Sequence, residues 1–82
     1  MLKSELHNIA EKYGFEIIRN ELTNEFKSLR LVSAAPIPAL DEIFSSNNND
    51  SLIGFLREPI GDEVIYTIYP PTNWFDLWGY DK

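Results

Sequence analysis

The spacing of apolar residues changes twice from a helical to a strand-like pattern, and this succession limits the fold more than any other feature of the chain. The first apolar residues recur at intervals of four, three and four, which is the stripe of an amphipathic helix: Leu2, Leu6, Ile9 and Tyr13. Gly14 follows where such a helix would end. The spacing therefore predicts a helix over residues 3–13.

A strand-like pattern follows the first helix. The segments 15–20 and 26–33 are rich in β-branched and aromatic residues, and a polar segment separates them. Two such segments with a short polar connection indicate a β-hairpin. If Thr23 and Asn24 form its turn, Ile18 faces Leu29 across the pair.

The same order then occurs a second time. Four apolar residues that follow Pro36, with Pro38 between the first two, share one helical face and predict a short helix near 37–45: Ile37, Leu40, Ile43 and Phe44. The segment 45–51 contains no apolar residue and is expected to be a loop. Residues 52–69 predict a second hairpin, in which Pro59, Ile60 and Gly61 form a three-residue loop. That loop would pair Arg57 with Glu63 and Gly54 with Tyr66.

These elements predict an α+β fold with the order αββαββ. The simplest packing is a four-stranded antiparallel sheet with both helices on one face, followed by an aromatic C-terminal tail. A chain of 82 residues is of single-domain size, so residues 1–82 are expected to form one domain.

The predicted strands place large apolar side chains on both faces of the sheet, although the helices cover only one. The tail, 70–82, is the remaining segment apolar enough to cover the second face. Trp74, Leu77 and Trp78 would form one ridge if Asn73 begins a short helical turn. We expect a partly buried lid whose exposed edge contributes to binding.

The charge is distributed unevenly along the chain. Residues 1–30 carry five basic and five acidic side chains, whereas 31–82 carry two basic and eight acidic ones, which accounts for the net charge of −6. This balance argues against direct nucleic-acid binding, which requires clustered Lys and Arg. It permits attraction to a basic protein surface, although solubility alone would also explain it.

Residue types that carry chemistry are few. There is no cysteine and one histidine, His7, and no glycine-rich phosphate-binding motif occurs. Adjacent acids such as Asp62 and Glu63 point to opposite sides of a strand, which disfavours a shared catalytic or metal site. We therefore expect no enzyme activity, no cofactor, no metal and no catalytic residue. The lack of cysteine and of a long apolar run favours the cytoplasm over a membrane or the cell exterior.

The function expected from these features is that of a small acidic, non-enzymatic binding protein. The expected class is an inhibitor that docks on a basic surface of a larger, nucleic-acid-handling protein, such as the anti-defence proteins of phages and mobile elements, anti-CRISPR proteins among them. The host cytoplasm would then be its place of action. Seven residues are the candidate partner-binding set: Glu58, Asp62, Glu63, Trp74, Asp76, Trp78 and Asp81.

Three alternatives remain open from the sequence. The chain could be a toxin-immunity type of inhibitor, which has similar size and charge. It could be a structural or regulatory homodimer whose second sheet faces meet about a two-fold axis. A small-ligand domain or minor enzyme is the third, and it would require a pocket lined by convergent polar groups.

Overall fold

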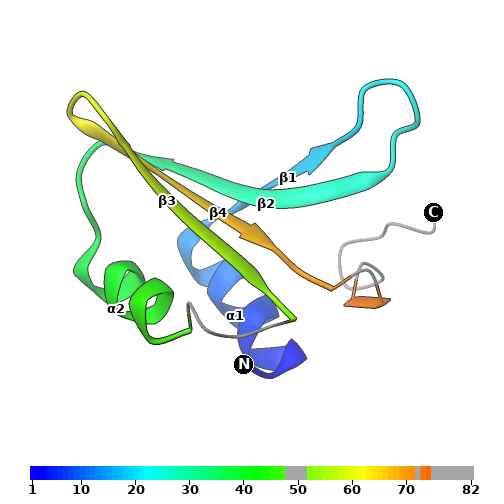
Figure 1. Ribbon diagram of the computed structural model, residues 1–82, viewed down its shortest axis with the longest axis horizontal. Coiled ribbons are helices and arrows are strands. Elements are labelled where there is room, and N and C mark those ends of the chain that lie inside the picture. The colour runs from blue at the N-terminus through cyan, green and yellow to red at the C-terminus, as the bar shows by residue number, and fades with distance from the viewer. Residues whose placement is uncertain (48–51, 72, 75–82) are drawn as a thin grey trace.

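The computed structural model describes residues 1–47, 52–71, 73 and 74. Its elements follow in the order α1 (Lys3–Tyr13), β1 (Glu16–Arg19), β2 (Phe26–Ser33), α2 (Pro38–Ser46), β3 (Gly54–Ile60) and β4 (Glu63–Tyr69). The strands form one antiparallel sheet in the order β1-β2-β4-β3, and both helices lie beneath it (Figure 1). The predicted α+β fold and the αββαββ order are confirmed.

The two hairpins are joined through their second strands. β2 and β4 pair antiparallel at the centre of the sheet, with Leu29 opposite Ile68 and Leu31 opposite Tyr66. β1 and β3 are therefore the edge strands. The sheet face that carries Leu29, Tyr66 and Ile68 is buried against the helices, and we call the opposite side the outer face.

The C-terminus of α1 and the N-terminus of α2 lie where the sequence predicts them. Gly14 adopts the left-handed conformation (φ 75°) after α1, and its N–H donates to the Ala10 carbonyl. A left-handed glycine at this position is a common helix C-terminus because it has no Cβ to clash. Pro38 occupies the first turn of α2, where a missing N–H costs no intrahelical hydrogen bond.

The predicted register of the first hairpin is wrong by one residue. Ile17, not Ile18, lies opposite Leu29, and Ile18 lies opposite Ser28. The loop is longer than a two-residue turn because the Asn20 side chain accepts hydrogen bonds from the N–H groups of Leu22 and Thr23. The pairing then shifts between Ile18 and Arg19, which leaves Lys27 as an extra residue in β2.

The predicted loop of the second hairpin is also wrong. Ile60 pairs with Glu63, so the turn consists of Gly61 and Asp62, with Gly61 at φ 60° as the first residue of a type II′ turn requires. The register differs from the prediction by three residues, and an odd shift reverses the faces of β3 relative to β4. Arg57 therefore lies opposite Tyr66 rather than Glu63, and the expected cross-strand ion pair is absent from the described contacts.

This register improves the packing of β3 against α2 and is compatible with Pro59. Phe55 now lies on the helix side opposite Ile68, and its ring packs edge-on to Phe44 of α2 at 5.1 Å. Pro59 falls in an edge strand, which needs fewer backbone donors than a central one. Gly54 lies opposite Tyr69, whose ring is so close that a Cβ on Gly54 would meet its side chain at 3.3 Å.

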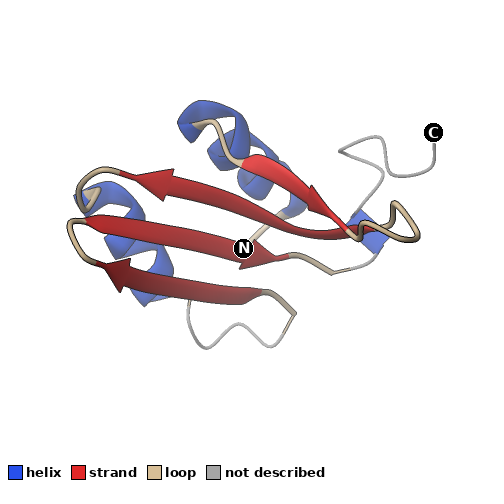
Figure 2. Cartoon of the chain, turned by 90° about the horizontal axis from the view of Figure 1, so that it is seen from above, coloured by secondary structure: helices blue, strands red, loops and turns tan. Residues whose placement is uncertain are grey.

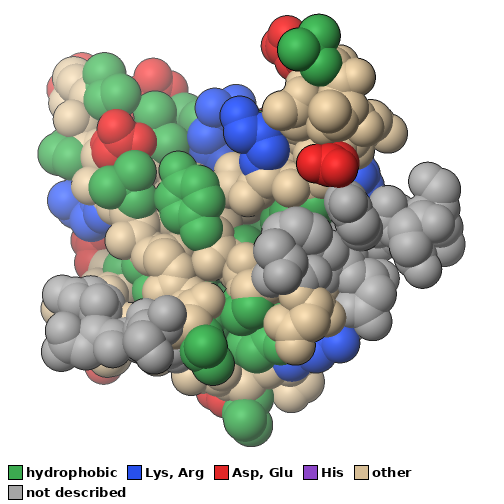
Figure 3. Space-filling model, turned by 45° about the vertical axis from the view of Figure 1, so that its right-hand side comes forward, with side chains coloured by type: hydrophobic (Ala, Val, Ile, Leu, Met, Phe, Trp, Pro, Cys, Tyr) green, Lys and Arg blue, Asp and Glu red, His purple; other side chains and the backbone are tan. Residues whose placement is uncertain are grey.

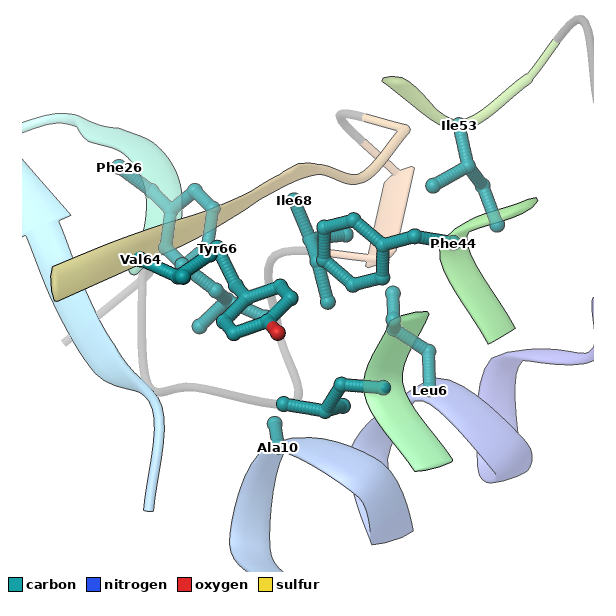
Figure 4. Close-up of a cluster of buried hydrophobic side chains, with 10 residues drawn as sticks. Leu6, Ala10, Phe26, Phe44, Ile53, Val64, Tyr66 and Ile68 are labelled. Carbon is teal, nitrogen blue, oxygen red and sulfur yellow. The ribbon is translucent and has the colours of Figure 1, made fainter. Parts of the chain in front are cut away.

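The core lies between the sheet and the helices (Figure 4). Tyr66 is central to it, with its ring edge-on to Phe44 at 5.2 Å. Ten buried residues form one cluster: Leu6, Ala10, Phe26, Leu29, Leu40, Phe44, Ile53, Val64, Tyr66 and Ile68. Phe26 belongs to this cluster because the extra residue Lys27 shifts the alternation of β2, which would otherwise place Phe26 on the outer face.

Within the described ranges, neither helix is long or apolar enough to cross a membrane.

Candidate functional site

The end of the β3–β4 hairpin presents acidic side chains around an apolar residue. Glu58, Asp62 and Glu63 are all exposed, and Ile60 beside the turn is 55% exposed. We call these four residues the hairpin end. It projects at the upper left of the molecule, at the junction of the yellow strands in Figure 1.

The charge of the hairpin end is not compensated by its own hairpin. Arg57 is the one cation on β3 and β4, and its Nε donates to Asp41 Oδ1 of α2 at 2.7 Å. None of the carboxylates of Glu58, Asp62 and Glu63 forms an ion pair with another described residue. Three negative charges therefore remain available to an external cation.

Asp41 is held by two donors from the sheet. The Tyr66 hydroxyl donates to its Oδ1 at 2.6 Å and accepts from the Ile37 N–H at 2.9 Å. The hydrogen bond from Tyr66, and then that from Arg57, lowers the pKa of the Asp41 carboxyl below its usual value. The same contacts, Asp41 first, raise the pKa of Arg57. This cluster fastens the start of α2 to the sheet, which is a structural role.

The outer face is the other uncovered surface. Seen from above, the described part of the chain places no helix in front of the sheet (Figure 2). Three of its apolar side chains are about half exposed in solvent: Val32 (48%), Leu56 (42%) and Tyr69 (47%). Apolar side chains therefore lie on the second face, as predicted. Phe15, Ile17, Phe26 and Phe55, which the predicted registers also assign to that face, pack with the core instead.

A groove of about 240 Å³ crosses the outer face. Its polar lining comes from three strands: Lys27, Ser28 and Arg30 of β2, Thr67 of β4, and Glu58 of β3. Ile18, Ile65 and Tyr69 provide the apolar lining. In the space-filling view, Lys and Arg side chains gather at the upper rim between two raised parts of the surface (Figure 3).

The groove was not found from the sequence. Its cationic residues belong to the part of the chain whose charges balance, and the bulge at Lys27 has no sequence signal of its own. Ser28 and Thr67 interrupt otherwise apolar strands, and a hydroxyl amid such strands was the one available indication.

The remaining candidate residues lie apart from the hairpin end. Trp74 is half-buried and packs against the hydrophobic core, and its backbone N–H donates to the Pro71 carbonyl. Its contact is with the core cluster between sheet and helices. Asp76, Trp78 and Asp81, with the ridge proposed for the tail, lie outside the described residues. Of the seven candidates, three acidic residues belong to the hairpin end, Trp74 packs against the core, and three positions lie outside the described residues.

In the described ranges, no three or more His, Cys, Asp or Glu side chains lie together as metal ligands would. No protein-family model matches the chain, and no match is found among curated proteins or among solved structures.

Proposed function

We propose that this protein is a small acidic, non-enzymatic inhibitor that docks through its hairpin end on a basic surface of a larger, nucleic-acid-handling protein. By occupying that surface it keeps nucleic acid away from it. The anti-defence proteins of phages and mobile elements, including anti-CRISPR proteins, are the functional class to which such an inhibitor belongs. The proposed place of action is the cytoplasm of the cell that contains the partner.

The observation that carries the proposal is the uncompensated charge at the hairpin end. Arg57 forms its ion pair with Asp41. The exposed carboxylates of Glu58, Asp62 and Glu63 therefore have no described counter-charge. Exposed charges of one sign accelerate the encounter with an oppositely charged surface. Ile60 lies among them as an exposed apolar residue that can be buried on contact.

A second feature favours a hairpin as the docking element. Gly61 adopts the positive φ that its turn requires. Arg57 of β3 and Tyr66 of β4 both donate hydrogen bonds to Asp41, which attaches the two strands to α2. A preorganised element loses less conformational entropy on binding than a flexible loop does. A toxin-immunity inhibitor would use the same surface, and the identity of the partner distinguishes the two classes.

The proposal is tested by quantitative capture from a lysate of the cells in which the gene resides. The wild-type chain, the variant Asp62→Lys/Glu63→Lys and the matched control Glu21→Lys/Glu25→Lys serve as baits. The control changes the net charge equally, but at the exposed loop between β1 and β2. We expect a basic nucleic-acid-handling protein that the wild type and the control retain and the hairpin variant loses.

The captured protein must then lose activity when the wild-type chain is added. Retention of the same proteins by all three baits would contradict the proposed docking surface. Capture without any loss of nucleic-acid binding by the partner would contradict inhibition.

A homodimer is a second candidate, and the half-exposed Val32, Leu56 and Tyr69 on the outer face favour it. Two copies could bury these side chains about a two-fold axis. Molar mass measured by light scattering at micromolar concentration separates the two functions. A monomer excludes the dimer, and a dimer that Leu56→Glu dissociates supports it.

A further inference from the structure

The outer-face groove is lined by two nearly buried residues, Ser28 and Thr67, whose hydroxyl groups have no described partner. Ser28 and Thr67 are each 6% exposed, and neither side chain forms a hydrogen bond with a described residue. No fully inaccessible side-chain oxygen or nitrogen among these residues lacks a partner, so both hydroxyls retain contact with the groove. Polar groups this deeply buried are normally paired. Their open side is therefore the place where a ligand acceptor would bind.

Two cations stand beside these hydroxyls. Arg30 lies directly opposite Thr67 on the neighbouring strand, and Ser28 precedes it by two residues on the same face. The bulge brings Lys27 into the same groove. Neither Lys27 nor Arg30 forms an ion pair with another described residue. Hydroxyls, an ammonium and a guanidinium together form a donor set that suits a phosphate group.

The side of the groove formed by β3 is acidic, whereas the side formed by β2 is basic. Glu58 lies on β3, and two strand spacings, or about 10 Å, separate β3 from β2. A simple phosphate ion bound over β2 would gain nothing from this carboxylate. A ligand that carries hydroxyl or amino groups away from its phosphate would satisfy both sides, because a carboxylate accepts hydrogen bonds from sugar hydroxyls.

Tyr69 and two isoleucines define the space between the polar ends. The Tyr69 ring is about half exposed at the groove, and Ile18 and Ile65 line it. Aromatic rings of this kind stack with nucleobases. The groove volume of about 240 Å³ lies just below the range of about 300–1,000 Å³ that is typical of small-molecule sites. One mononucleotide, rather than a nucleic-acid strand, matches this size.

We propose that the outer-face groove binds a nucleoside monophosphate, with its phosphate on the β2 residues Lys27, Ser28 and Arg30 and on Thr67, and its sugar toward Glu58. This site shares Glu58 with the hairpin end, but Asp62 and Glu63, the residues changed in the docking test, do not line the groove. Its failure would leave the docking proposal intact, and the reverse also holds.

The test is an NMR titration of the ¹⁵N-labelled full chain with each of the four common nucleoside monophosphates. Inorganic phosphate and the unphosphorylated nucleosides are titrated separately. We expect at least one monophosphate to shift amide signals of 27–30 and 65–69. Its dissociation constant should be roughly tenfold or more below those of phosphate and of the nucleoside, since both ends of the ligand contribute charged hydrogen bonds.

Three variants assign the interaction to the groove. Arg30→Gln should weaken monophosphate binding about tenfold or more, as expected for the loss of a charged hydrogen bond. Thr67→Val should weaken it while the spectrum of the free protein stays that of a folded chain. Lys12→Gln, which removes an exposed cation from α1, should leave the affinity unchanged.

Four results would overturn the proposal. They are the absence of groove shifts at millimolar monophosphate, equal affinity for inorganic phosphate, equal affinity for the unphosphorylated nucleoside, and equal weakening by Lys12→Gln and Arg30→Gln. The last would indicate general charge attraction instead of a built site.

Discussion

The Tyr66 hydroxyl connects three parts of the chain through two hydrogen bonds. It accepts from the Ile37 N–H at the start of α2 and donates to Asp41, which also accepts from Arg57 of β3. The ring itself is fully buried in the core. A residue of this kind contributes both apolar burial and the hydrogen bonds that fix the position of a helix on a sheet.

Removal of this hydroxyl should be costly. We expect Tyr66→Phe to lower the free energy of unfolding by about 1–3 kcal/mol, because it leaves the part-buried Ile37 N–H unpaired and removes one donor from Asp41. Urea denaturation measures the change. Tyr69→Phe is the matched control, since Tyr69 is half exposed and its hydroxyl has no described partner. Equal effects of the two substitutions would contradict the role assigned to Tyr66.

The Thr67 hydroxyl should behave in the opposite way. Thr67 is 6% exposed, and its hydroxyl opens onto the groove and makes no described hydrogen bond, so its loss breaks no pair. We expect Thr67→Val to leave the free energy of unfolding unchanged or to raise it by up to about 1 kcal/mol. A clear destabilisation in urea denaturation would show that the hydroxyl has a structural partner.

At the scale of elements, Asp41 makes the attachment of α2 sensitive to acid. Its pKa in the folded state is lowered by the Tyr66 and Arg57 hydrogen bonds. The stabilisation from a lowered carboxyl pKa is fully present above the unfolded-state pKa, near 3.8, and is lost as the pH falls through the lower folded-state value. Arg57 stays protonated over this range and adds no pH dependence.

The expected result is a smaller acid-induced loss of stability in Asp41→Asn than in the wild type. The comparison uses the free energy of unfolding in urea at pH 6 and at a pH below 3.8. Since the Asp41 side chain is one third exposed, solvent screening keeps the difference small. Glu42→Asn, an exposed neighbour on α2, is the control. Identical pH dependence of wild type and Asp41→Asn would contradict this account.

The turn of the second hairpin depends on Gly61 at φ 60°. Gly61→Ala should lower the free energy of unfolding by roughly 1–2 kcal/mol, the penalty of placing a Cβ in the left-handed region. Gly61→Asn should cost less, because Asn tolerates that region better than other side chains do. A calorimetric or urea measurement that finds the two variants equal would argue against this turn geometry.

The same turn shows how far the sequence could predict the fold. Apolar periodicity predicted both helices, both hairpins and the α+β order, because each is a local property of a segment. The registers depend on a single turn or bulge residue, and Gly61 was assigned the third place of a longer loop. One such error reversed the faces of β3 and predicted a pair between Arg57 and Glu63. The partner of Arg57 is Asp41, sixteen residues away, and no local pattern encodes that contact.

The candidate site was predictable to a similar degree. The acidic residues of the hairpin end could be identified because the excess of acidic side chains in 31–82 is visible in the sequence itself. Lys27, Ser28, Arg30 and Thr67 meet only when β2 and β4 pair, so their convergence is a tertiary property. Trp74 was expected among binding residues, and its packing against the core is a result of the chain path after Pro70.

At the scale of the whole molecule, acidic and basic side chains are concentrated on different parts of the described surface. The hairpin end is acidic, whereas Lys27 and Arg30 lie on the outer face of the sheet. A net charge of −6 therefore does not describe every surface of the protein. We propose macromolecular docking for the acidic hairpin end and small-ligand binding for the groove.

The docking of the hairpin end on a basic partner is the central claim, and the association rate of the captured partner tests it most directly. Surface plasmon resonance with wild type, Asp62→Lys/Glu63→Lys and the control Glu21→Lys/Glu25→Lys gives this rate at low and high salt. We expect the hairpin variant to associate roughly tenfold or more slowly than both others at low salt, with the difference shrinking as salt screens the charges. Equal association rates for the hairpin variant and the control, or rates independent of salt, would contradict the claim.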